Sequence, residues 1–294
     1  MGVQDVFLEG LFAPMRMVDC EDLIEGLSGY LPRWPFYLSD MGKATPCAVI
    51  AFNGTAWLIQ SRHTDAPRVH KTAVNAICDL VSILASAMIA QDPDHLCFHS
   101  AALEIDGDLV LFPAVRRSGK STLAAVLMAR GAALFTDDYL PVERDPDGAV
   151  IGRATGISAR LRMPLPDDFP ADTHAYVDAH PGPENKQYRY LSGPSVAPVG
   201  LRLPIISIVL LDRQESGKAT FSDVPEAELL GRLAYQNFSR GLPAGETLST
   251  LVALTQAAPA VHLSYSDPSE AADLILAGLP KGSKRAPTPI TFPE

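Results

Sequence analysis

The sequence predicts an α/β fold in which a mixed sheet is built around a strand–loop–helix–strand unit, with an α+β region before it. Leu109–Phe112 is a continuous apolar run, as expected of a strand buried on both faces, and Ala132–Thr136 predicts the next strand. Between them, Thr122–Arg130 is rich in Ala and Leu, and its apolar residues share one face of a helix. Such a βαβ unit normally joins a parallel pair of strands, so we expect these two strands to be paired.

Composition limits the classes of partner. The chain has 294 residues, of which 47% are apolar and 20% charged, and this is typical of a globular protein with a large core. Its formal net charge is -10 and its pI is near 5.1. A chain this acidic has few cations to replace the counterions of a nucleic-acid backbone, so we expect no nucleic acid among its partners.

The pattern of apolar residues and cysteines bears on location. The longest apolar stretch, Ala73–Ala90, is interrupted by Asn75 and Asp79, which favours a buried helix over a membrane span. Met1–Pro14 carries acidic residues and no basic leader. The four cysteines are far apart and form no CxxC pair. We therefore expect a cytoplasmic protein that does not bind a membrane.

Two elements are predicted before the central unit. Cys47–Ser61 has two β-rich runs around Asn53-Gly54, a pair that favours a tight hairpin turn with positive φ. Thr72–Gln91 carries Ala, Leu and Ile at helical spacing. Residues 1–45 predict no particular element. We therefore expect an N-terminal α+β region over residues 1–90, the main domain over 91–280 and a flexible tail over 281–294.

The remaining elements follow the same signals. Leu96–Ile105 predicts a strand that is joined to the next one by a turn at Asp106-Gly107. Gly131 has the position of a helix C-terminal cap. Residues 144–204 carry many Pro and Gly, so we expect little regular structure there and a functional role for the stretch. Further strands are predicted at Ile205–Asp212 and Ala260–Tyr265, and further helices at Glu226–Arg240, Thr247–Ala257 and Ser269–Ala277.

The loop between the first strand and the helix of the central unit matches a phosphate-binding loop, or P-loop. The template is G-x-x-x-x-G-K-[ST], and Gly119, Lys120 and Ser121 match its second half, while Ala114 stands where the first glycine is usual. In such a loop, backbone N–H groups and the helix N-terminus face phosphate oxygens. Lysine reaches the β- and γ-phosphates, and the serine hydroxyl binds Mg²⁺. The candidate nucleotide-binding residues are Ala114, Arg116, Arg117, Ser118, Gly119, Lys120, Ser121 and Thr122.

The departure at Ala114 leaves two interpretations of the loop open. If that position needs positive φ, alanine is strained there by of order 1 kcal/mol. The loop would then have a modified shape, in which Arg116 and Arg117 supply charge to the phosphates. Alternatively, Gly119 and the residues after it form a simple turn that caps a helix.

An acidic pair follows the second strand of the unit. Asp137 and Asp138 come directly after Thr136, at the end of a strand where α/β sheets bind their ligands. One carboxylate could hold Mg²⁺ while the other takes a proton from an attacking hydroxyl, since two close carboxylates raise one pKa. A solvated turn is the alternative. His99 lies on the preceding strand, where a histidine by itself is more often structural.

Together these residues resemble a known family. The run that includes His99-Ser100-Ala101-Ala102, Asp106-Gly107, the 118–123 segment and Thr136-Asp137-Asp138 looks like the C-terminal domain of the HPr kinase/phosphorylase group. It is most similar to the HPr-kinase-related proteins, which include the serine kinases found beside lasso-peptide clusters. The resemblance is strong over residues 95–143, weaker over 205–275, and does not cover 1–90.

The resemblance implies a fold related to phosphoenolpyruvate carboxykinase, the use of ATP and Mg²⁺, and phosphorylation of a serine in a protein or peptide. Lys120 and Ser121 match the nucleotide and metal positions. Asp137 and Asp138 match the aspartate pair that acts as base and metal partner, and His99 matches the histidine beside that pair. The implied metal ligands are therefore Ser121, Asp137 and Asp138.

The sequence also departs from the family. HPr kinases carry a Glu-x-Arg-Gly element downstream of the aspartates, and here the nearest basic pair is Arg160 and Arg162 without the Glu. That departure puts HPr as the substrate in doubt. Lys186 and Arg189 resemble a basic segment of related kinases and are candidates to clamp phosphates, with solvated surface charge as the alternative.

Two functional hypotheses follow. The first is an ATP- and Mg²⁺-dependent kinase that transfers phosphate to a serine or another hydroxyl of a peptide, protein or small molecule. The second is a non-catalytic regulatory module that binds nucleotide or phosphate through a degenerate P-loop. The sequence leaves open the identity of the acceptor, the choice between ATP and GTP, and whether the chain forms a homo-oligomer.

Overall fold

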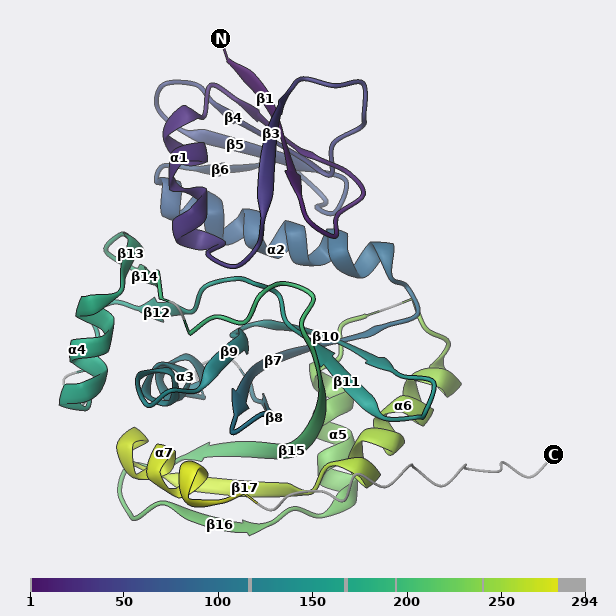
Figure 1. The fold of residues 1–294 in the computed structure, drawn as a ribbon, viewed down its shortest axis with the longest axis vertical. Coiled ribbons are helices and arrows are strands. Elements are labelled where there is room, and N and C mark those ends of the chain that lie inside the picture. The colour runs from purple at the N-terminus through teal and green to yellow at the C-terminus, as the bar shows by residue number, and fades with distance from the viewer. Residues whose placement is uncertain (1, 116–117, 167–168, 194, 240, 280–294) are drawn as a thin grey trace.

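The computed structural model describes residues 2–115, 118–166, 169–193, 195–239 and 241–279 of the chain. These residues form a mixed α/β structure with seven helices and three sheets. Figure 1 shows a smaller sheet with two helices that is stacked on a larger unit, which contains the other two sheets. The predicted tail over 281–294 lies outside the described residues.

The N-terminal sheet has six strands in the order β3-β1-β2-β4-β5-β6. Its predicted hairpin is confirmed, because β4 and β5 pair antiparallel across a turn in which Gly54 has a φ of 90°. Residues 1–45, for which no element was predicted, supply half of the sheet and a helix. The bounds are β1 Val3–Leu8, β2 Met15–Val18, α1 Glu21–Tyr30, β3 Phe36–Asp40, β4 Ala48–Phe52, β5 Trp57–Ser61 and β6 Arg68–His70.

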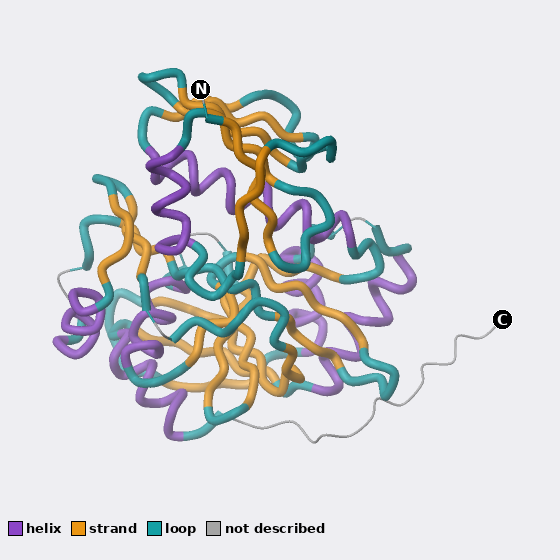
Figure 2. Tube along the Cα trace, turned by 45° about the horizontal axis from the view of Figure 1, so that its top comes forward, coloured by secondary structure: helices purple, strands orange, loops and turns teal. Residues whose placement is uncertain are grey.

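Helix α2, Ala73–Gln91, lies between the N-terminal sheet and the larger unit (Figures 1 and 2). It begins one residue after the predicted start, because Thr72 is its N-cap and the Thr72 hydroxyl accepts a hydrogen bond from the backbone N–H of Asn75. Within the described chain it is the helix that has the length and hydropathy of a membrane span, and half of its apolar window is buried inside the protein. Its buried residues, among them Ile77 and Leu84, pack in the same core as the N-terminal strands.

The central sheet has the order β11-β10-β7-β8-β15-β17-β16, and β9 also pairs with β7. The β7–β8 hairpin is confirmed, with Asp106 and Gly107 at φ 54° and 83° in its turn. The bounds are β7 Leu96–Ile105, β8 Asp108–Pro113, α3 Lys120–Ala129, β9 Ala133–Thr136, β10 Tyr139–Arg144, β11 Val150–Arg153, β15 Arg202–Arg213, β16 Thr220–Asp223, α5 Glu226–Gln236, α6 Ala244–Ala257, β17 Ala260–Tyr265 and α7 Pro268–Ala277.

The strands of the predicted βαβ unit are not paired with each other. Strand β7 lies between β8 and β9 and runs antiparallel to both, so the two strands are parallel but separated by one position. The prediction of a parallel pair was therefore wrong at this point, because β7 takes the place that a second parallel strand normally has. In the central sheet, the described parallel strand pairs are β8 with β15 and β15 with β17.

The prediction of irregular structure over residues 144–204 was also wrong in part. This stretch contains β11, a nine-residue helix α4, Ala171–Ala179, and a small sheet of order β12-β14-β13. The small strands are β12 Arg160–Arg162, β13 Pro181–Glu184 and β14 Tyr188–Leu191. Three- and four-residue strands are too short to give a periodic pattern among prolines, which explains why the sequence did not predict them.

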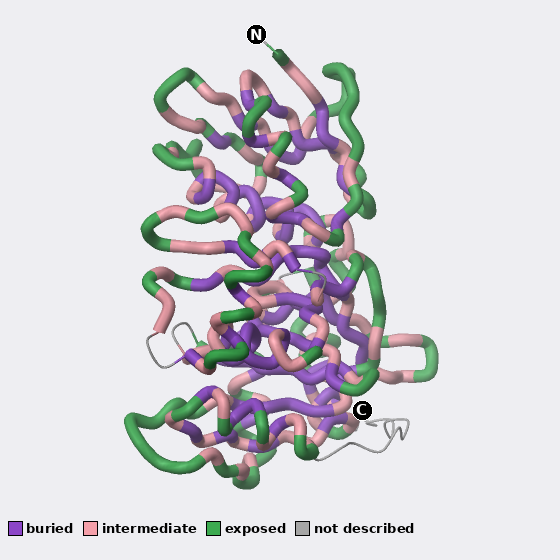
Figure 3. Tube along the Cα trace, turned by 60° about the vertical axis from the view of Figure 1, so that its left-hand side comes forward, coloured by how far each residue is buried: buried purple, intermediate pink, exposed green. Residues whose placement is uncertain are grey.

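Helices cover both faces of the central sheet. Val110 and Phe112 of β8 pack in one core with α3, α4 and α7, whereas Leu109 and Leu111 pack in another with α5 and α6. Successive side chains of a strand point to opposite faces, so burial on both sides requires the continuous apolar run seen in the sequence. Figure 3 shows buried stretches running through both units, with exposed residues mostly at their margins.

Candidate functional site

The loop that follows β8 leads directly into the N-terminus of α3. Gly119, the residue before the helix, has φ 90° in the left-handed region. A Cβ atom at this position would lie 2.6 Å from the Tyr265 hydroxyl oxygen, closer than real Cβ contacts come. Both the conformation and the lack of space therefore require glycine before Lys120.

Lys120 is almost fully buried, and its ammonium group turns back across the loop. Its Nζ donates a hydrogen bond of 3.2 Å to the backbone oxygen of Ala114, which ties the two ends of the loop together. Ala114 is buried and does not have positive φ, since Asp19 and Asp106 are the non-glycine residues with positive φ in the described part of the chain. The strain considered for Ala114 is therefore absent. Arg116 and Arg117 lie outside the described residues.

The acidic pair lies beside this loop because of the strand order. Ser100 of β7 is paired with Pro113 at the end of β8, and on its other side its N–H donates a hydrogen bond of 3.2 Å to the Asp138 carbonyl. The end of β8 and the Asp137-Asp138 link between β9 and β10 are thus separated only by β7. The antiparallel strand that was not expected between β8 and β9 is what sets this spacing.

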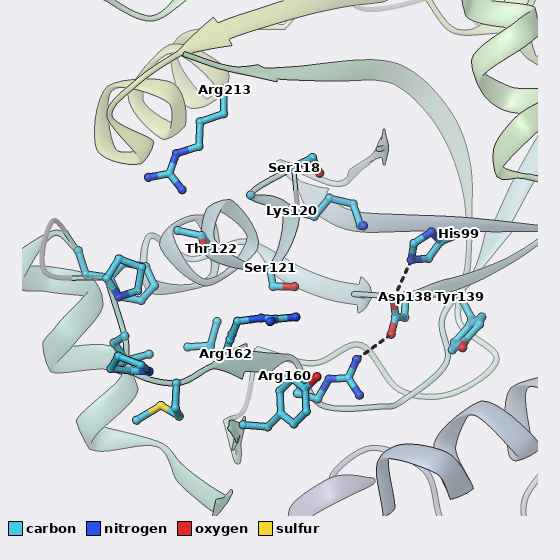
Figure 4. A pocket seen from close by; sticks show the side chains of 18 of the residues that line it. His99, Ser118, Lys120, Ser121, Thr122, Asp138, Tyr139, Arg160, Arg162 and Arg213 are labelled. Carbon is cyan, nitrogen blue, oxygen red and sulfur yellow. Dashed lines mark hydrogen bonds and ion pairs between the residues drawn. The ribbon is translucent and has the colours of Figure 1, made fainter. Parts of the chain in front are cut away.

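Asp138 is held from two sides. His99 Nε2 lies 3.1 Å from its Oδ1, and the Arg160 guanidinium lies 3.3 Å from its Oδ2 (Figure 4). The side chains of His99 and Asp138 are about one third exposed, at 34% and 38%. His99 is opposite Tyr139 in the β7–β10 pairing, one position from Asp138, so the strand register brings histidine and aspartate together. The structure thus joins two residues that the sequence singled out separately.

The two aspartates have opposite shifts of pKa. Burial raises the pKa of Asp137 to about 6, and the charge of Asp138 adds to this, although Lys120, Ser121 and a backbone hydrogen bond from Arg160 oppose it. Burial also acts to raise the pKa of Asp138, but the hydrogen bond from His99 and the charges of Arg160, His99 and Lys120 outweigh it and lower that pKa. At neutral pH, Asp138 is therefore the more firmly ionised carboxylate.

A cleft of about 730 Å³ connects these groups. One wall is the start of α3 with Ser118 to Thr122, and the wall opposite comes from β12 and β14 (Figure 4). Its described lining carries four basic side chains and one acidic one, Asp138, in a chain whose net charge is -10. The basic residues are Lys120, Arg160, Arg162 and Arg213. Positive charge is thus gathered in this cleft while the chain as a whole is acidic.

Helix α2 of the N-terminal region also reaches the cleft. Ser82 lines it, and the hydroxyl of Tyr139, the residue after Asp138, donates a hydrogen bond of 3.1 Å to Ser82 Oγ. Tyr190 of β14 donates a hydrogen bond of 3.3 Å to the thiol sulfur of Cys78, one turn earlier on the same helix. The sequence assigned no role at the site to residues 1–90.

The predicted phosphate clamp, Lys186 and Arg189, does not line the cleft. Lys186 is exposed in the turn between β13 and β14, and Arg189 is paired with Glu184 and Asp178. Arg189 is opposite Leu161 in the strand register, whereas Arg160 and Arg162 are opposite tyrosines on the other face. Arg160 and Arg162 therefore line the cleft, and Arg189 does not. The alternation in Arg-Leu-Arg and Tyr-Arg-Tyr is the sequence signal that could have shown this.

The residues present fit a divalent cation bound together with phosphate. Asp137 Oδ1 and Ser118 Oγ are buried and have no hydrogen-bond partner among the described residues. The Ser121 side chain lies near enough to Asp137 to lower its pKa. The described residues hold no cluster of three or more His, Cys, Asp or Glu side chains suited to a metal. Mg²⁺ commonly takes one or two carboxylates and fills its other positions with water and substrate phosphates, so this ligand set is sufficient.

Comparison with known proteins adds little to this geometry. No family model matches the sequence, and no curated protein matches it. Among solved structures, the chain is similar to the Hpr(Ser) kinase/phosphatase from Coxiella burnetii, with a TM-score of 0.29 and 13% sequence identity over 58% of this chain and 85% of the other. That protein is a distant structural neighbour, and a similarity this weak assigns neither a fold family nor an activity to the chain.

Proposed function

We propose that this protein is an ATP- and Mg²⁺-dependent phosphotransferase that phosphorylates a hydroxyl group of a peptide, protein or small molecule. One observation carries the proposal. The N-terminus of α3, with Gly119, the buried Lys120 and Ser121, lines one side of the cleft. Asp138, held by His99 and Arg160, lies on the other side. Phosphoryl transfer needs these two halves, a site for the phosphates and a site for the attacking hydroxyl.

The donor half would be the loop and the start of α3. The backbone N–H groups of a helix's first turn have no partner inside the helix, and they carry partial positive charge that favours phosphate. Gly119 allows the backbone to approach the phosphates closely, and Lys120 has an ammonium group that could exchange the Ala114 carbonyl for a phosphate oxygen. This is the P-loop interpretation of the sequence, and the cleft supports it.

Ser121 and Asp137 would hold the metal. When bound there, Mg²⁺ would neutralise charge on the transferring phosphoryl group and on the leaving diphosphate. The raised pKa of Asp137 supports this role. A buried carboxylate whose oxygen has no partner among the described residues is unfavourable when ionised, and a bound cation would relieve that cost. The same residues would also orient the phosphate chain towards Asp138.

Asp138 would receive the proton of the acceptor. The hydroxyl oxygen attacks the γ-phosphorus, the bond from that phosphorus to the bridging oxygen breaks, ADP leaves, and the hydroxyl proton passes to Asp138. Geometry decides between the two aspartates, because Asp138 lines the cleft whereas Asp137 Oδ1 is buried beside it. His99 and Arg160 fix the orientation of this carboxylate and keep it ionised.

The test separates binding from transfer. ATP binding is measured by calorimetry with and without Mg²⁺, and turnover is measured as slow ATP hydrolysis with water as the acceptor. We expect Mg²⁺-dependent binding that Lys120→Ala weakens by at least 10-fold. We expect Asp138→Asn to bind ATP within about threefold of the wild type and to lose 10²-fold or more of turnover.

Two results would contradict the proposal. Wild-type protein that binds no nucleotide would show that the loop does not serve a triphosphate. Binding with no turnover in the wild type, or turnover that Asp138→Asn leaves unchanged, would instead favour a non-catalytic module that binds nucleotide or phosphate.

A further inference from the structure

The wall of the cleft opposite α3 carries three residues, and the proposed reaction uses only one of them, Arg160, through its contact with Asp138. Arg160 and Arg162 lie two positions apart on β12, so both side chains are on one face of the small sheet. Tyr188 of β14 is paired with Arg162, and its ring centre lies 4.8 Å from the guanidinium carbon of Arg160 and 5.9 Å from that of Arg162. We call Arg160, Arg162 and Tyr188 the arginine shelf.

The two arginines differ in their partners. Arg160 is partly buried and forms an ion pair with Asp138. Arg162 is exposed, and within the described parts of the chain it has the Tyr188 ring beside it but no acidic or hydrogen-bonding partner. An aromatic ring under a guanidinium limits its freedom while leaving its N–H donors available. The Arg162 guanidinium is therefore restrained by the Tyr188 ring, has no counter-charge among the described residues, and lines the cleft.

Charge indicates what this cation binds. ATP with Mg²⁺ brings a net charge of about -2, and the proposed donor half already offers Lys120 and the start of α3. Among the described basic residues, Lys120 belongs to the donor half and Arg160 is paired with Asp138, so the charge of Arg162 is used by neither. Guanidinium groups pair with carboxylate and phosphate through two parallel hydrogen bonds.

From this arrangement we propose that the arginine shelf binds an anionic group of the phosphate acceptor. This inference rests on the proposed function. It predicts that the acceptor is a hydroxyl compound that also bears a carboxylate or a phosphate. The hydroxyl would lie at Asp138, beside Arg160, and the anion at Arg162. Side chains two positions apart on a strand are about 7 Å apart, which sets the spacing between hydroxyl and anion in the acceptor.

The first experiment looks for the anion site with the donor site filled. Inorganic phosphate is titrated into protein saturated with Mg²⁺ and the non-hydrolysable β,γ-imido analogue of ATP, and binding is followed by calorimetry. We expect a phosphate site that Arg162→Gln weakens at least 10-fold and that Arg162→Lys partly restores. Arg189→Gln is the matched control, because this arginine lies on the opposite face of the same small sheet, and it should leave phosphate binding unchanged.

The outcomes separate the two proposals. Binding of the ATP analogue without a second phosphate site, or with a site that Arg162→Gln does not alter, overturns the arginine shelf and leaves the proposed function intact. If Arg162→Gln weakens binding of the ATP analogue as much as it weakens binding of phosphate, Arg162 belongs to the donor site and the inference is overturned. Failure of the wild type to bind the analogue at all overturns the proposed function together with the inference that rests on it.

A second experiment identifies the source of the anion. Transfer from ATP is compared for sn-glycerol 3-phosphate against glycerol, and for the peptide acetyl-Ala-Ser-Ala-Glu-Ala-amide against its Gln counterpart. We expect a preference of at least 10-fold for the anionic member of one pair, expressed in KM and lost in Arg162→Gln. A preference within the glycerol pair would identify the acceptor as a small molecule, and a preference within the peptide pair would identify it as a peptide with an acidic side chain. A wild type that shows no preference for the anionic member of either pair contradicts the proposal.

Discussion

At the scale of single residues, the site depends on two adjacent aspartates whose environments differ. Asp137 is enclosed and has one oxygen without a hydrogen-bond partner among the described residues, whereas Asp138 is held by His99 and Arg160. The first environment disfavours the charged carboxylate and the second favours it. Neighbouring acids in one site can thereby take different tasks, one as a metal ligand and one as a proton acceptor.

These shifts predict opposite effects of two substitutions on stability. The pKa of Asp137 is about 6 when folded and near 3.8 when unfolded, so the folded protein binds the proton more tightly between these values. Its contribution to the free energy of unfolding therefore falls as pH rises from about 4 to about 6, and above that the ionised group costs about 3 kcal/mol. We expect Asp137→Asn to stabilise the ligand-free protein by about 1–3 kcal/mol at pH 8 and by little at pH 4.

Asp138 is the matched control for this prediction. Its folded pKa is lowered, so its contribution is present above the unfolded pKa and is lost as pH falls through the folded one. Asp138→Asn should therefore destabilise the protein at pH 8. Urea unfolding of both variants at pH 8 and pH 4 measures the difference, and equal signs for the two variants would contradict the assignment.

The glycines that flank α3 give a second prediction at this scale. Gly119 and Gly131 have φ values of 90° and 100° at the two ends of the helix, but a Cβ would meet Tyr265 only at Gly119 and nothing within 4 Å at Gly131. Gly131→Ala should cost about 1 kcal/mol, from backbone strain alone. Gly119→Ala should cost more and weaken ATP binding at least 10-fold. Adding Tyr265→Phe should recover part of the loss, and a cost equal to that of Gly131→Ala would contradict the steric argument.

At the scale of elements, the site is assembled by strand register and by helix α2. The register of β7 with β8 and β10 aligns Pro113, Ser100 and Asp138 across the sheet. Helix α2 then contacts residues on both sides of Asp138, through Ser82 to Tyr139 and through Cys78 to Tyr190. The N-terminal region therefore forms part of the support of the acidic pair.

The hydrogen bond between Tyr139 and Ser82 can be measured by a double-mutant cycle. Ser82→Ala leaves a partly buried tyrosine hydroxyl without its acceptor, which should cost about 1 kcal/mol in the free energy of unfolding. Combined with Tyr139→Phe, the cycle should give a coupling of about 0.5–1.5 kcal/mol. Ser86→Ala is the control, since its hydroxyl donates only to the Ser82 carbonyl one turn back. A coupling no larger for Ser82 than for Ser86 would show that α2 does not support β10.

How far the sequence predicted these elements depends on length and burial. The strands β7, β8, β15 and β17 were predicted within about three residues, because long apolar runs and an Asp-Gly turn mark them. The small sheet and α4 were missed among prolines. His99, Lys120, Ser121 and Asp138 were singled out from the sequence and do meet in one cleft, whereas Lys186 and Arg189 do not line that cleft and Arg160 and Arg162 do. Which face of a short strand meets a cleft depends on tertiary packing, and the sequence does not encode it locally.

At the scale of the whole molecule, the N-terminal region and the larger unit share a hydrophobic core. Ile157 and Tyr190, from the stretch that carries the arginine shelf, pack in the same cluster as the strands and helices of residues 1–90. The rings of Tyr30 and Tyr190 meet edge to face at 5.0 Å. Gly156, with φ 68°, approaches the Arg33 and Trp34 backbone so closely that a Cβ would lie 2.7 Å from the Arg33 oxygen. The boundary near residue 90 that the sequence suggested is thus crossed by buried contacts.

This shared core predicts cooperative unfolding of the two regions. Both tryptophans, Trp34 and Trp57, belong to residues 1–90, so their fluorescence follows the N-terminal region, while circular dichroism follows the whole chain. We expect the two signals to change at the same urea concentration, because breaking either region exposes the core of the other. Tyr190→Ala should shift both transitions together to lower urea, by the 3–5 kcal/mol typical of removing a buried aromatic side chain. Tyr235→Ala, at a residue 77% exposed, is the control and should shift neither. A fluorescence transition that precedes the circular dichroism transition would mean that the N-terminal region unfolds by itself, and the support that α2 gives to the acidic pair would then be lost before the central sheet unfolds.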